Sequence, residues 1–257
     1  MDKVWLKSYP EDVASDVDLE QYQSIVDIFD ESVERFKQKP AFTNLGVTLT
    51  FQDLEHQSAR FASYLQNDLK LPKGSRVAIM MPNLLQYPVA IFGVLRAGMT
   101  VVNVNPLYTA RELKHQLNDS QATTIVIVEN FASTLEKVID ETSVQNVVLT
   151  AIGDSCGFLK RFIVNTVVRK VKKMVPDYNL KKYHWFNDTI AYGSRQPFRK
   201  VSVVADDIAF LQYTGGTTGV AKGAVLLHRN MVANIQQASA WLKPLIEEGK
   251  EVIITAL

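Results

Sequence analysis

A segment rich in glycine and threonine lies between two apolar stretches toward the C-terminal end of the sequence. It reads YTGGTTGVAKGA and runs from Tyr213 to Ala224. Glycines let backbone N–H groups converge on an anion, hydroxyl groups donate to phosphate oxygens or ligate Mg²⁺, and a lysine offsets negative charge. The segment therefore predicts a site for the phosphates of a nucleotide. The residues of these types are Thr214, Gly215, Gly216, Thr217, Thr218, Gly219, Lys222 and Gly223.

The spacing separates this loop from other phosphate-binding motifs. A Walker A loop needs Gly-Lys followed by Ser or Thr, whereas Lys222 lies between Ala221 and Gly223. The dinucleotide pattern G-x-G-x-x-G is also absent. The segment instead resembles the AMP-binding signature of the adenylate-forming superfamily, which includes acyl-CoA synthetases, luciferases and peptide-synthetase adenylation domains. Ala221 replaces the proline found in most of that superfamily, so we expect a less stiff loop.

A second stretch extends the resemblance. Residues Met81 to Ser120, MPNLLQYPVAIFGVLRAGMTVVNVNPLYTARELKHQLNDS, resemble the N-terminal subdomain of bacterial long-chain fatty-acid CoA ligases. The likeness covers nearly the whole chain. It implies a two-step reaction in which a long-chain fatty acid attacks the α-phosphorus of MgATP to give acyl-AMP and pyrophosphate, after which coenzyme A displaces AMP.

The resemblance also implies which residues contact the nucleotide. Thr214 and Lys222 are expected to act on the polyphosphate during transfer, and Thr214 is a candidate ligand of Mg²⁺. The family's later Y-G-x-T-E motif, ribose-binding aspartate, hinge and C-terminal lysine do not occur here, so the chain is expected to be a fragment, truncated at its C-terminal side and inactive alone. The expected nucleotide-binding residues are Tyr213, Thr214, Gly215, Gly216, Thr217, Thr218, Gly219, Val220, Ala221, Lys222, Gly223 and Ala224.

The elements that would position this loop follow an alternating pattern. Strand patterns alternate with helical ones, which predicts right-handed βαβ crossovers and an α/β fold with mainly parallel sheets flanked by helices. The loop itself is predicted to join a strand to a helix. Expected strands cover 41–51 (a pair), 77–81, 100–104, 124–128, 146–150, 208–213 and the terminal EVIITAL, and expected helices cover 24–36, 51–69, 84–97, 110–118, 131–141 and 226–241.

Three segments are expected along the chain. Residues 1–150 form an N-terminal α/β subdomain, 151–205 a basic and partly amphipathic connection, and 206–257 the start of an incomplete subdomain that carries the phosphate loop. Residues 77–95 contain no charged residue. Pro82 and Asn83 divide this stretch, which favours a strand, a turn and a packed helix over a membrane span.

Charge is distributed unevenly. The formal net charge is +1, yet residues 151–200 hold eleven Lys and Arg against three Asp. Gly157 to Tyr178 predicts an amphipathic basic helix with Val164, Val167, Val168, Val171, Met174 and Val175 on one face and Arg169, Lys170, Lys172 and Lys173 opposite. Two interpretations stay open: contact with an anionic membrane surface, or a helix packed on its own domain with a solvated basic face. No base-reading pattern accompanies these charges, so nucleic acid binding is not expected.

Other motifs give weaker alternatives. Gly153 to Gly157 matches G-x-S-x-G after a strand, so a serine hydrolase with Ser155 as nucleophile is an alternative, although no earlier glycine run could form its oxyanion hole. The four histidines lack metal-ligand spacing, and His228 is expected to be structural.

Cys156 has no partner for a disulfide and the opening lacks a signal peptide. We expect a cytoplasmic protein, with peripheral attachment to the inner face of the cytoplasmic membrane as an extension, and a homo-oligomer is compatible with the sequence.

Overall fold

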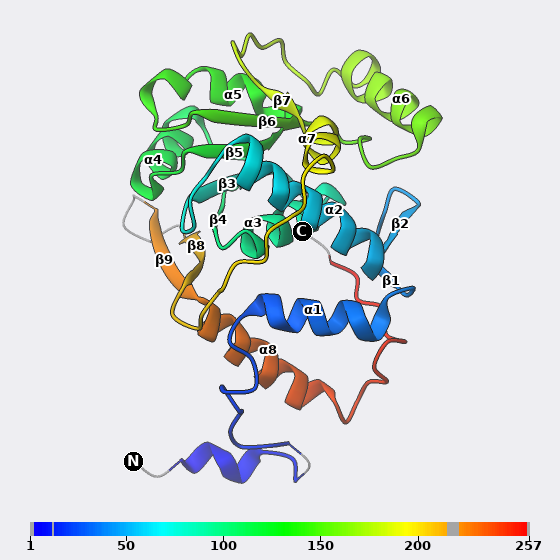
Figure 1. Cartoon of the computed structure of the whole chain (residues 1–257), viewed down its shortest axis with the longest axis vertical. Helices are drawn as coiled ribbons and strands as arrows, with labels where there is room; N and C mark the ends of the chain where they lie inside the picture. Colours follow the sequence, from blue (N-terminus) through cyan, green and yellow to red (C-terminus); the bar gives the residue numbers. More distant parts are fainter. Residues whose placement is uncertain (1–2, 12, 215–220, 256–257) are drawn as a thin grey trace.

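A seven-stranded sheet forms the centre of the computed structural model, which describes residues 3–11, 13–214 and 221–255 (Figure 1). The strand order is β7-β6-β5-β3-β4-β8-β9. All neighbouring strands pair in parallel except β8 and β9, which are antiparallel. The strands are β3 (Arg76–Met80), β4 (Thr100–Asn103), β5 (Thr124–Val128), β6 (Asn146–Thr150), β7 (His184–Trp185), β8 (Ile208–Thr214) and β9 (Lys222–Leu227).

Helices cover both faces of this sheet. The α-helices are α1 (Ile25–Phe36), α2 (Phe51–Ser63), α3 (Gln86–Arg96), α4 (Ala110–Ser120), α5 (Ala132–Glu136), α6 (Phe158–Thr166), α7 (Phe186–Gly193) and α8 (His228–Leu242). Single 3₁₀ turns occupy Val4–Ser8, Glu129–Phe131 and Ile139–Glu141, and π-helical turns extend α2 over Tyr64–Asp68 and α6 over Val167–Val171.

Alternate strand residues face the two helical layers. Val101 and Phe210 belong to a core with α1, α2, α3 and α7. Val102 and Leu211 belong to the opposite core, which contains Leu113 of α4 together with α5. Because both faces are covered, the inner strands are nearly continuous apolar runs, as is typical of parallel sheets.

Sequence signals at the helix starts explain where several helices begin. Ser24, Thr50 and Thr109 each cap a helix with the side-chain oxygen. The carboxylate of the acidic residue three positions later accepts a hydrogen bond from the cap's backbone N–H. This arrangement satisfies backbone donors that the first helical turn would otherwise leave free. Thr109 and Glu112 therefore fix the start of α4 locally. Further along this helix, His115 and Asp119 contact residues of the predicted phosphate segment.

A separate two-stranded hairpin, β1 (Pro40–Asn44) and β2 (Val47–Thr50), lies beside α6. Its turn places Leu45 and Gly46 at φ 48° and 64°. The Lys160 side chain of α6 donates to the carbonyl of Leu45. This bond links α6 to the hairpin tip.

Most expected elements are confirmed, including every strand from β3 to β6 and β8, and the αβ alternation between them. Four expectations are wrong. The loop leads into strand β9 before α8, the expected helix over 131–141 breaks into α5 and a 3₁₀ turn, and the helix expected to reach 178 ends at 171. Residues 251–255 form no strand, because no neighbouring strand pairs with them and an isolated strand has little stability of its own.

The three-segment division stays a prediction. The sheet draws strands from each segment, since β7 pairs with β6 and β8 pairs with β4. Over the described part of the chain, no helix has both the length and the apolar character needed to cross a bilayer.

Candidate functional site

The predicted phosphate loop connects the two antiparallel strands of the β8–β9 hairpin. Tyr213 pairs with Gly223, and Thr214 pairs with Lys222. The side chains of Thr214 and Lys222 are exposed at the end of the hairpin where the loop joins the two strands. Gly215 to Val220 lie outside the described residues. The structure thus brings together Thr214 and Lys222, the two residues expected to act on the polyphosphate, at the carboxyl end of a buried strand.

A cavity of about 560 Å³ lies beside this hairpin, where β3, β4 and β8 end. In parallel sheets this edge collects loop backbone and polar side chains, and ligands bind there. The polar and aromatic residues that line it are Tyr87, Asn103, Asn105, Tyr108, Gln212 and Tyr213.

A hydrogen-bonded chain crosses the cavity floor. The Tyr87 hydroxyl donates to Oδ1 of Asn103 over 3.0 Å, and Nδ2 of Asn103 donates to Oε1 of Gln212 over 3.0 Å. Gln116 holds the same strand end by donating to the carbonyl of Asn103 over 2.7 Å. Burial raises the pKa of the Tyr87 phenol, which keeps it protonated and able to donate. These groups are uncharged and fit a ligand that is recognised by hydrogen bonds rather than by ion pairs.

Tyr213 faces α4. Its hydroxyl donates to Oδ2 of Asp119, and burial followed by this hydrogen bond raises the pKa of the phenol well above its ordinary value. Its ring packs against Gly223, where an added Cβ would lie 2.9 Å from the ring's Cζ. Gly223 is therefore needed for close approach between the strands.

The remaining described residues of the signature have structural contacts. The carbonyl of Ala221 accepts a hydrogen bond from Nε2 of His115 over 3.0 Å, and Ala224 pairs with Gln212 across the hairpin. Sequence reasoning missed Tyr87, Asn103 and Gln212. The available signal was the amide side chain of Asn103 at the end of one buried apolar strand and that of Gln212 inside another. Buried parallel strands seldom carry an amide that lacks a hydrogen-bond partner.

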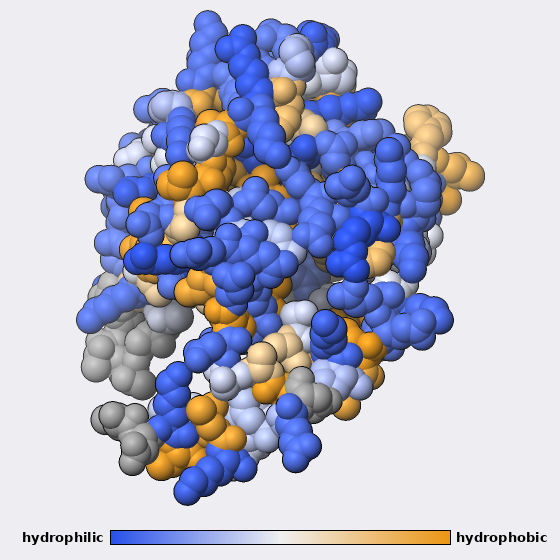
Figure 2. Space-filling view, turned by 60° about the horizontal axis from the view of Figure 1, so that its bottom comes forward, coloured by the Kyte–Doolittle hydropathy of each residue, from blue (hydrophilic) through white to orange (hydrophobic). Residues whose placement is uncertain are grey.

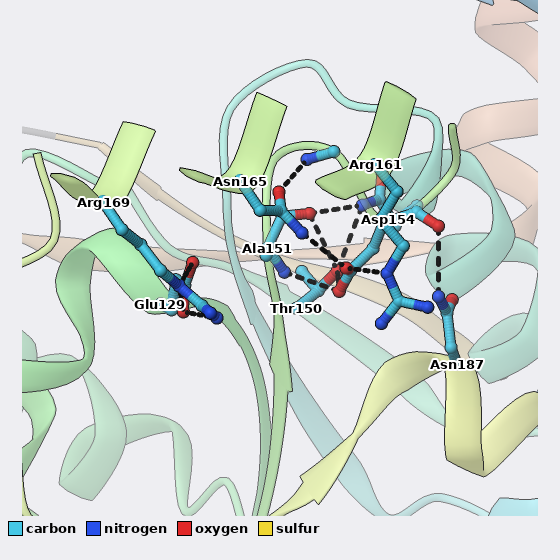
Figure 3. A network of polar contacts seen from close by, with 10 residues as sticks. Glu129, Thr150, Ala151, Asp154, Arg161, Asn165, Arg169 and Asn187 are labelled. Carbon is cyan, nitrogen blue, oxygen red and sulfur yellow. Dashed lines mark hydrogen bonds and ion pairs between the residues drawn. The ribbon is translucent and has the colours of Figure 1, made fainter. Parts of the chain in front are cut away.

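Ser155 lies in the turn after β6, and its neighbour Asp154 dominates the contacts there (Figure 3). The buried Asp154 carboxylate accepts from the backbone N–H of Ala151, from Arg161 and from Asn165. None of the hydrogen bonds found over the described ranges involves the Ser155 hydroxyl. The hydrolase alternative stays an untested prediction, and this turn's evident role is to anchor α6.

His228 begins α8 and is 1% exposed. Its Nδ1 accepts a hydrogen bond from the backbone N–H of Ile25 over 3.3 Å, and burial lowers the pKa of the imidazole to about 4. The ring is therefore neutral near pH 7, as its acceptor role requires. Its contacts join α8 to α1, away from the hairpin tip, which fits the expected structural role.

Known proteins resemble this chain along its length. A profile of the family described as AMP-binding enzyme matches residues 29–257. The chain is 57% identical over 257 residues to a long-chain-fatty-acid–CoA ligase of Escherichia coli O157:H7 and covers 46% of that protein. It is 34% identical over 253 residues to one of Bacillus subtilis, covering 44% of it. The chain thus spans about half the length of the curated relatives it matches.

Solved structures share the fold. A long-chain-fatty-acid-CoA ligase from Archaeoglobus fulgidus superposes with a TM-score of 0.66 at 27% identity, over 85% of this chain and 39% of that one. The anthranilate CoA ligase AuaEII in complex with anthranoyl-AMP superposes with a TM-score of 0.67 at 20% identity, over 83% and 37% of the two chains.

Proposed function

The chain belongs to the AMP-binding enzyme family, and from this premise we propose that it supplies the polyphosphate-binding part of an ATP-dependent long-chain fatty-acid CoA ligase. The single observation that carries the proposal is the hairpin that holds Thr214 opposite Lys222 beside the cavity at the strand ends. Relatives that are 57% identical over the entire chain and are named long-chain-fatty-acid–CoA ligases support the choice of substrate.

The proposed reaction has two balanced steps. A fatty-acid carboxylate oxygen attacks the α-phosphorus of ATP, the bond to the β-phosphate oxygen breaks, and acyl-AMP and pyrophosphate form. The thiol of coenzyme A then loses its proton and attacks the acyl carbonyl carbon, and AMP leaves with the bonding electron pair.

This chain would act in the first step. Negative charge grows on the leaving pyrophosphate, and a lysine and a hydroxyl aimed at it lower the barrier without forming a covalent bond. Lys222 and the Thr214 hydroxyl are the described groups at the hairpin end that could do so. Mg²⁺ would neutralise phosphate charge, and its preference for oxygen ligands fits the Thr214 hydroxyl together with phosphate oxygens and water.

A chimera tests the proposal. Residues 1–257 replace the matching segment of the Escherichia coli O157:H7 relative, which supplies the remaining length. We expect oleate-dependent exchange of pyrophosphate into ATP, lowered about 100-fold or more by Lys222→Ala. Lys243→Ala, at an exposed lysine after α8, is the matched control and should leave the rate unchanged. A folded chimera without exchange, or an unaffected Lys222→Ala variant, would contradict the proposal. Labelling of Ser155 by a fluorophosphonate probe would favour the hydrolase instead.

We further propose that 157–178 contacts an anionic membrane surface, placing the protein at the inner face of the cytoplasmic membrane. Four large apolar side chains of α6 are exposed: Phe158, Leu159, Phe162 and Ile163, at 91%, 70%, 67% and 52%. Much of the molecular surface is hydrophilic, with separate apolar patches (Figure 2), so such a cluster on one short helix needs an explanation.

The helix is held so that this cluster faces outward. On its inner side Arg161 pairs with Asp154, and Arg169 pairs with Glu129; both carboxylate side chains are 1% exposed (Figure 3). Val164, Val167 and Val168 of the predicted apolar stripe are half-buried, whereas Val171 is 70% exposed. The first part of the stripe thus packs on the protein's own domain, and we assign the lipid contact to the cluster from Phe158 to Ile163. Exposed lysines follow the cluster, and apolar insertion next to basic side chains suits anionic lipid.

Vesicle flotation checks this second proposal. We expect the chimera to float with vesicles that contain about 30% phosphatidylserine. With vesicles of neutral phosphatidylcholine it should remain in the dense fraction. Phe158→Ser with Phe162→Ser should lower partitioning about tenfold or more. Leu245→Ser, at another exposed apolar residue, is the control. Equal partitioning of all three proteins would exclude α6 as the contact.

A further inference from the structure

Helix α4 contacts both limbs of the β8–β9 hairpin through two polar side chains one turn apart. His115 and Asp119 are separated by four residues, so they project from the same face of the helix. Nε2 of His115 bonds to the carbonyl of Ala221 over 3.0 Å. The Asp119 carboxylate accepts from the hydroxyl of Tyr213. Ala221 directly follows the segment 215–220, and Tyr213 lies two positions before it, so the two contacts bracket the predicted phosphate loop.

The contact through Tyr213 reaches the second limb as well. The Tyr213 ring packs on Gly223 of β9, leaving no room for a Cβ there. A shift of the Tyr213 ring would therefore also displace β9 at Gly223. Asp119 holds the ring through its hydroxyl, and the ring in turn restrains the strand that His115 holds directly.

Helix α4 is a firm base for these contacts. Leu113 and Leu117 are fully buried in the core between α4 and the sheet. Gln116 bonds to the end of β4 over 2.7 Å, and Thr109 caps the first turn. Helices fixed by core packing on one side position side chains on the other more precisely than loops do.

Strand β9 lies at the edge of the sheet, where its ladder with β8 and the packing of Leu226 on the core hold it. Within the described part of the chain, β9 pairs with β8 alone. Each of its residues is exposed or half-buried, and Val225 is 54% exposed. An edge strand of this kind can bend or separate at low cost. The hydrogen bond from His115 to the Ala221 carbonyl thus adds a restraint at the point where the chain re-enters the sheet, one residue before Lys222.

We propose that His115 and Asp119 are positioning residues that set the separation of Thr214 and Lys222 for the polyphosphate of ATP. The inference rests on the proposed ligase function. It assigns α4 a role in nucleotide binding although neither side chain touches the ligand itself. Errors of about 1 Å in such positioning are costly, since the groups that stabilise developing charge act only at hydrogen-bond distance.

Kinetics on the chimera provide the first test. His115→Ala and Asp119→Ala should raise KM for ATP about tenfold, with KM for oleate changed less than about twofold. The conservative variants should stay near wild type, because His115→Gln keeps a donor at the same distance and Asp119→Asn keeps an acceptor. His56→Ala and Asp140→Ala, at exposed positions elsewhere, are the matched controls.

A second readout does not depend on catalysis. Trypsin cleaves after Lys222, and in the chain of residues 1–257 we expect cleavage there to accelerate about fivefold in the alanine variants, because opening of the hairpin becomes more frequent. Tyr213→Phe removes only the hydroxyl and retains the ring, so it should fold and show the same acceleration.

The outcomes separate the two hypotheses. A wild-type chimera without exchange activity contradicts the ligase proposal, and trypsin sensitivity still measures the restraint on the hairpin. Active chimeras whose KM for ATP and cleavage rate are unchanged by His115→Ala, Asp119→Ala and Tyr213→Phe overturn the positioning role. Equal rises in KM for ATP and for oleate would also overturn it, since they would indicate general loosening of the fold.

Discussion

Gly223 shows how a single residue type shapes the candidate site. Its φ is not in the left-handed region, so backbone freedom is not the reason for glycine here. The reason is the Tyr213 ring, which leaves less than contact distance for any Cβ. This glycine of the signature thus serves packing within the hairpin, in addition to the anion-binding role expected of it.

Substituting this glycine should destabilise the hairpin. Gly223→Ala is expected to lower the free energy of unfolding by about 1 to 3 kcal/mol, because the ring must shift and its bond to Asp119 must stretch. Gly157→Ala is the matched control, since nothing lies within 4 Å of its added Cβ. Urea unfolding followed by circular dichroism measures both. Equal effects of the two substitutions would show that the ring adapts freely.

His228 makes stability depend on pH. Burial lowers the pKa of the imidazole from 6.5 to about 4, so the folded state binds fewer protons than the unfolded state between these values. The contribution is complete above about pH 6.5 and is lost as pH falls toward 4, amounting to roughly 2 to 3 kcal/mol.

The variant His228→Asn isolates this effect. Its Oδ1 can accept the Ile25 N–H in place of Nδ1, and it does not titrate. The stability advantage of wild type over the variant should therefore shrink by roughly 2 to 3 kcal/mol between about pH 7.5 and pH 4.5. A constant difference across that range would mean that the ring is protonated without cost.

At the level of single residues, sequence reasoning found the loop but not the cavity. Tyr213 to Ala224 carry an unusual density of glycine and hydroxyl residues, which has a direct chemical meaning. Asn103 and Gln212 are ordinary amides whose partnership depends on β4 and β8 being neighbours in the sheet. Their pairing across 109 positions of sequence has no local signal.

Among the elements, α6 departs furthest from its expected role. In α6 and its π-helical extension, Val164, Val167 and Val168 are half-buried, while Phe158 and Phe162 are exposed. The buried carboxylates of Asp154 and Glu129 hold Arg161 and Arg169 on the inner side. Apolar periodicity alone favoured the valine stripe. The position of two acidic side chains on other elements decided the orientation.

Removing one of these carboxylates should release the helix. Asp154→Asn is expected to lower the free energy of unfolding by about 2 to 4 kcal/mol, because Arg161, Asn165 and the Ala151 N–H lose a charged acceptor at a buried position. Asp188→Asn, at an exposed residue of α7, should have little effect. Hydrogen exchange of the α6 amides measures the release directly, and unchanged protection would show that valine packing suffices.

Strand β9 and the terminal EVIITAL illustrate why short apolar runs are ambiguous. The sequence pattern predicts loop and helix for the run KGAVLL, yet this run pairs with β8. Residues 251–255 have a stronger strand pattern and pair with nothing. Strand formation depends on an available neighbour, which a local pattern does not contain. The inner strands were predictable because burial on both faces leaves long β-branched runs.

For the molecule as a whole, the chain carries one side of the proposed reaction. Residues 1–257 correspond to 46% of the Escherichia coli relative, and the groups that would position the fatty acid and coenzyme A are expected in the remainder. We predict that the purified chain forms no oleoyl-CoA from oleate, MgATP and coenzyme A, since positioning both reactants supplies about 7 to 11 kcal/mol in favourable systems. Thioester formation above an enzyme-free control would refute this, and the chimera is the positive control.

The sheet order has a consequence for synthesis on the ribosome. Strand β8 pairs with β4. Phe210 of β8 lies opposite Val101 of β4, although Phe210 follows Val101 by 109 positions in the chain. Because translation proceeds at about 5 to 20 residues per second, the edge of β4 stays unpaired for on the order of 5 to 20 s before β8 is synthesised. The rest of the parallel sheet can assemble during that interval. The edge of the sheet that carries the proposed nucleotide site is thus completed last among the described strands, and until then an unpaired apolar strand edge is open to chaperones and to other nascent chains.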